Sequence, residues 1–181
     1  TYYPWVQITD TGQNASLWVP PSVVALGTMG SSASRSELWF APAGFTRGGL
    51  TQGSAGFPVT AVRDRLTSKQ RDELYQQQVN PIATFPAEGI VIFGQKTMQV
   101  TPSALDRINV RRLMIFVKKE ISRMAATTLF DQNVRSTWNR FLGRVNPFLR
   151  SVKARLGLTD FKVILDETTT TPELVDRNIM Y

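Results

Sequence analysis

The chain has 181 residues and a mass of 20.3 kDa, with 42% hydrophobic and 19% charged residues. This composition is typical of one globular domain, or of one domain with an annex, and it excludes disorder throughout. Cysteine and histidine are absent. Disulfides, thiolate or imidazole metal sites, and enzymes with Cys–His or Ser–His–Asp centres are therefore excluded. No apolar run approaches the roughly 18 residues that a membrane span needs, so we expect no membrane partner.

The net charge of +7 is concentrated in one segment. Between residues 107 and 155 there are twelve basic residues, opposed only by Glu120 and Asp131, which makes this segment +10 and the remainder −3. Such a region predicts attraction to an acidic surface, whether nucleic acid, an anionic membrane or an acidic protein. The plainer alternative is that these residues line the solvated faces of helices. The basic residues are Arg107, Arg111, Arg112, Lys118, Lys119, Arg123, Arg135, Arg140, Arg144, Arg150, Lys153 and Arg155.

The first third of the chain predicts a strand pair, a helix and a loop. The sequences TYYPWVQI and ASLWV form the strand pair, joined by a turn at residues 9–12. Pro20 and Pro21 begin a helix whose apolar face would carry Val23, Val24, Leu26 and Met29. The stretch from residue 39 to 56 is rich in Gly, Ala and Pro. It lacks the GxxxxGK[ST] pattern, so we expect a structured loop and no nucleotide cradle.

The middle of the chain predicts three further elements. Thr67 and Gln70 fit a capping box at the start of a helix that runs to about residue 78. The run IVIF between Gly89 and Gly94 predicts a short buried strand. Asp106 is predicted to cap a long helix over residues 107–126. Its apolar face comprises Val110, Leu113, Met114, Val117, Ile121 and Met124.

The last third predicts a second helical region over residues 133–156, split at Pro147 with Asn146 as a new N-cap. Its buried stripe would be Phe148, Leu149, Val152 and Leu156, and Gly157 would end it. Residues 161–167 (FKVILDE) predict the clearest strand of the sequence. A polar turn at residues 168–171, a short helical turn from Pro172 and an extended segment over residues 178–181 complete the chain.

The acidic residues offer little for catalysis. Asp166 and Glu167 are neighbours, so on a strand their side chains point to opposite faces, and no calcium- or magnesium-binding run occurs. We therefore expect no catalytic residues, no metal and no cofactor. Nucleic-acid binding is the alternative function, since the basic residues could contact phosphates. Against it, no nucleic-acid-binding motif is present, and Trp138, the one candidate for base stacking, is better explained by core packing.

Five sequence blocks together resemble one protein family. WFAPAGFTRGGL, QRDELYQQQVNPI, GIVIFGQKT, DRINVRRLMIFVKKEI and LDETTTTPELVDRN follow one another as in the contractile tail sheath proteins of bacteriophages. The resemblance covers the C-terminal, tube-proximal part of those subunits, roughly from Val19 onward. It implies that residues 1–66 end a preceding sheath region and that residues 67–181 form the C-terminal domain, truncated before its last strand and arm.

The resemblance implies an α/β fold of the α+β type, with helices packed on a small mixed sheet that strands from neighbouring subunits complete. It also implies a virion protein, assembled in the bacterial host cytoplasm into a helical homo-oligomer around an inner tail tube. Contraction would drive the tube through the host envelope to deliver the genome. The implied partners are the acidic surface of the tube protein, the baseplate and the tail terminator. The resemblance argues against nucleic acid as a partner.

Charge and helical face together suggest the residues that contact the tube. We expect Arg150, Lys153 and Arg155 to make this contact, with Lys118 and Lys119 as second choice. The chain begins with Thr1, lacks the large preceding portion of a sheath protein and stops at Tyr181, where the family continues with a further strand and arm. We therefore expect a processed protein or, better, a piece of a longer one.

Overall fold

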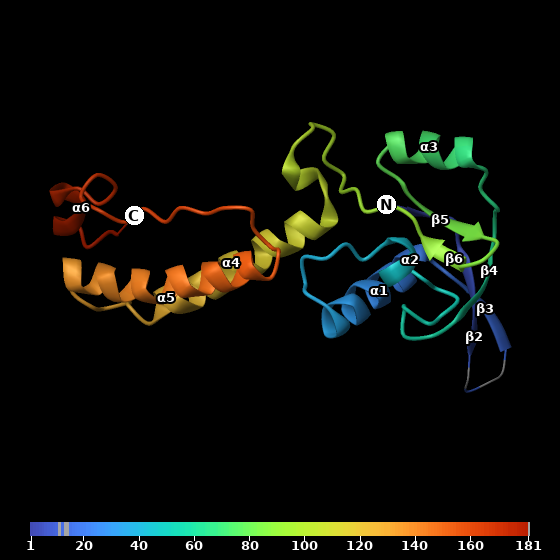
Figure 1. Cartoon of the computed structure of the whole chain (residues 1–181), viewed down its shortest axis with the longest axis horizontal. Helices are drawn as coiled ribbons and strands as arrows, with labels where there is room; N and C mark the ends of the chain where they lie inside the picture. Colours follow the sequence, from blue (N-terminus) through green and yellow to red (C-terminus); the bar gives the residue numbers. More distant parts are fainter. Residues whose placement is uncertain (11, 13–14, 181) are drawn as a thin grey trace. The chain divides into compact units, whose positions relative to one another are not determined.

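The computed structural model describes residues 1–10, 12 and 15–180, which group into two compact units, Thr1–Leu113 and Met114–Tyr181. The fold combines helices with small sheets, which confirms the predicted α+β class (Figure 1). The predicted division at residue 66 falls inside the first unit and stays a prediction. The predicted turn at residues 9–12 includes Thr11, which lies outside the described residues.

The first unit contains two three-stranded sheets. In one, β2 (Val6–Asp10) pairs antiparallel with both β3 (Ala15–Val19) and β4 (Val59–Val62). In the other, β5 (Asn80–Phe85) pairs parallel with β1 (Tyr2–Tyr3) and antiparallel with β6 (Gly89–Ile92). The strand pair predicted at the start of the chain is therefore present as β2 and β3. The segment TYYPWVQI is not one strand, because Pro4 separates β1 from β2 and the two join different sheets.

The core of the first unit lies where β2, β4, β5 and β6 face the helix α1 (Pro21–Arg35). The predicted helix is confirmed, but its apolar face is not the predicted one: Val23 and Leu26 are 43% and 69% exposed. Of the predicted face, Val24 is fully buried, and it shares the buried face with Ala25, Thr28 and Ser32. Small side chains suit this face because the backbone at Ala55 approaches the helix closely at Gly27. The other buried core members are Val6, Val19, Leu50, Ala55, Val59, Ile82, Ile90 and Ile92.

The Gly-rich stretch between residues 39 and 56 is an ordered loop that contains one short helix, α2 (Gly44–Arg47). It lies along β6: Leu50 N–H donates to the Ile90 carbonyl at 2.7 Å, and Ile92 N–H donates to the Gly48 carbonyl at 2.9 Å. The loop backbone is thus satisfied by the sheet, which allows the Leu50 side chain to be fully buried.

Helix α3 (Ser68–Gln76) begins with the predicted capping box. The Thr67 hydroxyl accepts from Gln70 N–H at 3.4 Å, and the Gln70 side chain accepts from Thr67 N–H at 2.9 Å. The predicted cap at Asp106 is wrong. Asp106 ends a short 3₁₀ turn, η1 (Ala104–Asp106), whose cap is Ser103, and the long helix α4 (Ile108–Ala126) starts after Arg107, whose backbone is extended.

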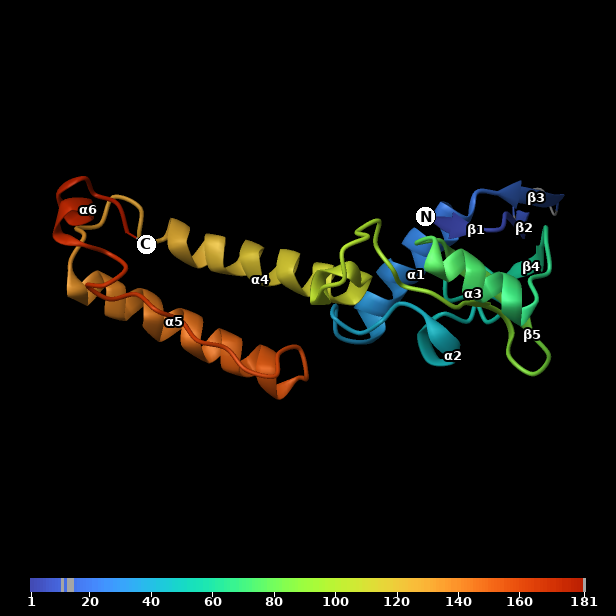
Figure 2. The same ribbon diagram turned by 90° about the horizontal axis from the view of Figure 1, so that it is seen from above.

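The second unit is built on α4 and α5 (Arg135–Ala154), which run antiparallel (Figure 2). The predicted split of α5 at Pro147 is wrong, and Asn146 is not an N-cap: the helix is continuous through the proline. The ring of a helical proline crowds the residue four positions earlier, which here is Gly143. The backbone carbonyl of Gly143 takes this crowding, and Val145, Leu149 and Val152 are buried on both sides of Pro147, so packing holds the helix together.

The end of α5 also differs from the prediction. Leu156 is 80% exposed and outside the buried stripe, and it adopts a left-handed backbone with φ of 63°. Its N–H donates to the Lys153 carbonyl at 3.0 Å, and Gly157 N–H donates to the Val152 carbonyl at 2.9 Å. These two bonds form a Schellman motif in which Leu156 occupies the position usually taken by glycine.

The predicted strand at residues 161–167 is not a strand in this chain. The segment is extended and returns along α5, but it forms no strand pairing with any described residue (Figures 1 and 2). Its exposure alternates as a strand's would, with Leu165 buried between exposed Ile164 and Asp166. The pattern was therefore correct, but a strand also needs a partner. Helix α6 (Pro172–Asp176) starts at the predicted Pro172, and residues 178–180 form no strand.

Two glycines of α1 provide a matched test of its packing. A Cβ on Gly27 would lie 2.2 Å from the Ala55 carbonyl oxygen, whereas a Cβ on Gly30 would meet nothing within 4 Å. Gly27→Ala should destabilise the protein by about 1–3 kcal/mol through overpacking. Gly30→Ala should stabilise it by up to about 1 kcal/mol because alanine favours helix. Urea unfolding followed by circular dichroism measures both; equal effects would contradict the close approach of loop and helix.

Candidate functional site

One side of α5 is buried by apolar residues, and the basic residues on its other side therefore point outward. Val145, Leu149 and Val152 are 1%, 6% and 0% exposed, and they recur on one side of the helix. Arg150 and Lys153 are three residues apart, so they are neighbours on the helix surface, and both are exposed. The predicted outward orientation of these two residues is therefore present in the structure.

The predicted contact residues at the end of α5 differ in their own interactions. Lys153 Nζ lies 2.9 Å from Asp160 Oδ1, and this hydrogen bond is the main reason that the pKa of Asp160 is lowered. Arg155 follows the last turn, and its Nε donates to the Ser151 carbonyl at 3.4 Å. Arg150 forms no ion pair with any described residue. Arg150 therefore has the charge most available to an outside partner.

The second group, Lys118 and Lys119, lies on α4, and both side chains are exposed. The rings of Phe116 and Phe148 pack with their centroids 5.9 Å apart, so the two helices are in contact at this level. Lys118 and Lys119 lie within one turn of Phe116, and Arg150 lies within one turn of Phe148. The structure thus brings Arg150 of the first group to the same level of the helix pair as the second group.

Trp138 is packed rather than presented to solvent. It is 6% exposed, and its indole Nε1 donates to Asn133 Oδ1 at 2.7 Å. Asn133 in turn donates to the Ile179 carbonyl at 2.9 Å, which ties α5 to the end of the chain. The prediction that Trp138 is a core residue is confirmed, and it provides no surface for base stacking.

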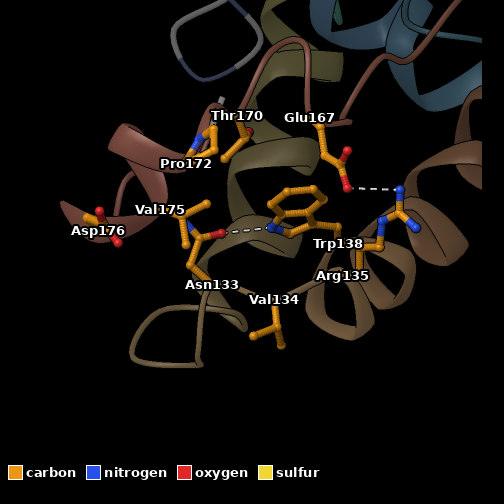
Figure 3. A pocket seen from close by; sticks show the side chains of 9 residues that line it. All are labelled: Asn133, Val134, Arg135, Trp138, Glu167, Thr170, Pro172, Val175 and Asp176. Carbon is orange, nitrogen blue, oxygen red and sulfur yellow. Dashed lines mark hydrogen bonds and ion pairs between the residues drawn. The ribbon is translucent and has the colours of Figure 1, made fainter.

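A hollow of about 280 Å³ beside Trp138 is bordered by α6 and by an ion pair at its rim (Figure 3). The pair joins Arg135 to Glu167 at 2.9 Å. Both side chains are exposed, so this pair is worth about 0–1 kcal/mol. The hollow is smaller than the roughly 300–1,000 Å³ usual for ligand sites. Its residues are Asn133, Val134, Arg135, Trp138, Glu167, Thr170, Pro172, Val175 and Asp176.

Among residues 1–10, 12 and 15–180, no group of three or more acidic side chains is arranged to hold a metal ion. In the same part of the chain, no helix has the length and apolar character needed to cross a bilayer.

Asp166 organises the turn that leads from the extended segment into α6. Its carboxylate accepts from Thr168 N–H at 2.9 Å and from Thr169 N–H at 3.3 Å, and it also accepts from the Thr168 hydroxyl. The Thr168 hydroxyl bond is the largest cause of a lowered pKa at Asp166. The predicted polar turn at residues 168–171 is thus present, and the sequence had given Asp166 no part in it.

Both sequence and structure comparisons lead to contractile tails. The chain is 33% identical to the tail sheath protein of Enterobacteria phage T4 and 35% identical to that of Vibrio phage KVP40, in each case over 169 residues and 93% of this chain. It covers 25% and 24% of those proteins, so it spans about a quarter of the curated relatives that it matches. No protein-family model matches the chain.

Solved structures agree with the sequence relatives. The sheath complex of PVC, an extracellular contractile injection system, in its contracted state matches with a TM-score of 0.83 and 25% identity over 99% of this chain and 49% of that chain. The contracted helical sheath of the anti-feeding prophage matches with a TM-score of 0.80 and 25% identity, over 99% of this chain and 49% of that chain.

The lowered pKa of Asp166 predicts a pH-dependent turn. A carboxyl whose pKa is lower in the folded state stabilises that state above its unfolded pKa, and the contribution is lost as pH falls through the folded pKa. Acidification, or Asp166→Asn at neutral pH, should therefore lower the protection of the Thr168 and Thr169 amides against hydrogen exchange, measured relative to the intrinsic exchange rate at the same pH. Asp72→Asn, at an exposed residue of α3, is the control. Unchanged exchange after Asp166→Asn would contradict the role of this carboxylate.

Proposed function

We propose that this chain, a homologue of part of the contractile tail sheath proteins, is a structural segment of a contractile sheath and not an enzyme. The observation that carries the proposal is the identity of 33–35% to tail sheath proteins across 93% of the chain. The TM-score of 0.83 to a contracted sheath complex supports it. In this proposal residues 67–181 belong to the C-terminal sheath domain, and residues 1–66 end the region before it.

The proposed activity is mechanical. Copies of the protein assemble in the host cytoplasm as a helical array around an inner tail tube and become part of the virion. Contraction of this array drives the tube through the host envelope and delivers the genome. The baseplate and the tail terminator are the proposed partners at the two ends of the array. The energy is conformational, so the proposal requires no nucleotide or metal.

The unpaired segment at residues 161–166 supports assembly by strand exchange. Its backbone is extended and pairs with no strand among the described residues, and only Asp166 at its end is hydrogen-bonded into the following turn. An extended segment with open hydrogen-bonding groups is suited to pairing with a strand from a neighbouring subunit. In the proposed sheath, such strands complete the sheet of this domain.

The basic surface of the helix pair is the proposed contact with an acidic inner tube. The main contacts in this proposal are Arg150 and Lys153. Arg155, at the end of α5, and Lys118 and Lys119, on α4, make further contacts. Exposed ion pairs are each worth about 0–1 kcal/mol, so any one of them is weak. Many such contacts along a tube can hold the array in register, yet each can break when the subunits move.

Self-assembly tests the proposed function against nucleic-acid binding. The protein, expressed alone and treated with nuclease, should form hollow helical tubes with a regular repeat when viewed by electron microscopy. Such tubes need no nucleic acid. Dispersed monomers that bind DNA, with an affinity that falls steeply with salt, would instead support the alternative function.

Charge reversal tests the tube contact. Arg150→Glu combined with Lys153→Glu should abolish assembly of the protein on purified inner tubes, because attraction to an acidic surface becomes repulsion. Sedimentation with the tubes measures this. Arg63→Glu combined with Arg65→Glu changes the net charge equally at two exposed residues of the first unit and should leave assembly intact. Equal assembly of both variants would reject Arg150 and Lys153 as contacts.

A further inference from the structure

On one face of the first unit, cationic side chains lie over aromatic rings. The Arg71 guanidinium carbon lies 4.9 Å from the Phe85 ring centroid and 5.6 Å from that of Phe93. Lys96 Nζ lies 4.1 Å from the ring centroid of Tyr75. Arg107 lies 5.8 Å from the same ring, and its guanidinium donates to the Tyr75 hydroxyl. We call this set the cation–aromatic surface: Arg71, Tyr75, Phe85, Phe93, Lys96 and Arg107.

This surface leaves positive charge uncompensated. Arg71 and Lys96 form no ion pair within the described part of the chain, and Arg107 pairs with Asp106 at 3.1 Å. A guanidinium stacked on a ring keeps its N–H donors free at the edges. Such a surface is suited to carboxylates, and Asp72 on α3 is the one acidic residue that lines its hollows.

The shape of the surface suits a peptide segment rather than a small molecule. Two hollows, of about 360 Å³ and about 240 Å³, share Tyr75 and Phe93 in their linings. Arg71 lines the larger hollow and Arg107 the smaller one. Phe93 is 42% exposed, so an occupant would also cover apolar area. The complementary partner therefore presents two carboxylates close together beside apolar side chains.

The chain itself contains an acidic segment that could supply such carboxylates. Residues 160–176 include five acidic residues and one lysine, a net charge of −4 in a protein whose total is +7. Asp160, Asp166 and Glu167 are occupied by Lys153, by the turn and by Arg135. Glu173 and Asp176, on α6, are exposed and form no ion pair with described residues.

The two free carboxylates lie on one side of α6. Glu173 and Asp176 are three residues apart, so they are neighbours on the helix surface. Figure 3 shows Asp176 on α6 at the edge of the hollow beside Trp138, and its side chain remains exposed. Leu174 and Val175, which lie between them in the sequence, are half-buried on the opposite side of α6, and Val175 lines the hollow beside Trp138.

We propose that α6 of one copy docks on the cation–aromatic surface of a second copy, with Glu173 and Asp176 facing Arg71 and the cations beside it. The inference rests on the proposed sheath function, because an open helical array requires two different, complementary surfaces on each chain. An acidic segment and a cationic surface on the same chain meet that requirement.

The absence of cysteine allows a direct test by cross-linking. One copy of the full chain carries Ser68→Cys beside Arg71, and a second copy, with a tag that changes its mass, carries Thr171→Cys at the start of α6. A short bismaleimide should join the mixed copies into a heterodimer on a denaturing gel. Ser22→Cys, on α1, replaces Ser68→Cys in the control mixture and should give at most a tenth of that product.

Charge exchange identifies the contact. Glu173→Arg with Asp176→Arg in the second copy should lower the yield of heterodimer at least tenfold, and Arg71→Glu in the first copy should restore it. A missing heterodimer, or one that charge reversal leaves unchanged, overturns the docking whether or not helical tubes form. Tubes are scored by microscopy in the same samples, so docking can fail while the proposed sheath function stands.

Discussion

The orientation of α5 depends on the burial of one apolar stripe, and the rest of the second unit depends on that orientation. Val145, Leu149 and Val152 are removed from water on one side of the helix, each worth roughly 1.5–3 kcal/mol. This burial exceeds the cost of an internal proline, about 3 kcal/mol, and keeps the helix continuous. A helix that cannot rotate presents Arg150 and Lys153 outward as a fixed pair of charges.

The elements that sequence predicts well are those whose cause is local. The capping box of α3 needs only Thr67 and Gln70, and the start of α6 needs only Pro172, so both could be placed without knowledge of the fold. The exposure of Arg150 and Lys153 follows from helical periodicity in the same way. Trp138 could be assigned to the core because it lies on the stripe side of its helix.

The features that were missed depend on partners distant in the sequence. The buried face of α1 is lined by small residues because a loop some 28 residues away presses on Gly27, and periodicity favours larger apolar residues. Leu156 in a left-handed conformation is a local alternative that residue preference ranks lower. Ser103, the cap of η1, is as good an N-cap as Asp106, so preference alone could not choose between them. The cation–aromatic surface combines α3, β5 and the segment after β6, and no single stretch of sequence contains it.

The segment after α5 is tied at both of its ends, and its length then determines its shape. Lys153 holds Asp160, and Arg135 holds Glu167. Eighteen residues of helix separate the two basic side chains, about 27 Å at about 1.5 Å per residue. Seven residues of fully extended chain reach only about 23–25 Å between the two acidic ones. The extended segment together with the four side chains therefore spans this length. Each exposed pair is worth only about 0–1 kcal/mol, so the two pairs favour a straight segment without fixing it. A strand arriving from outside would then meet a template that is already biased towards the extended form, and would face less of the backbone ordering cost of about 1–2 kcal/mol per residue.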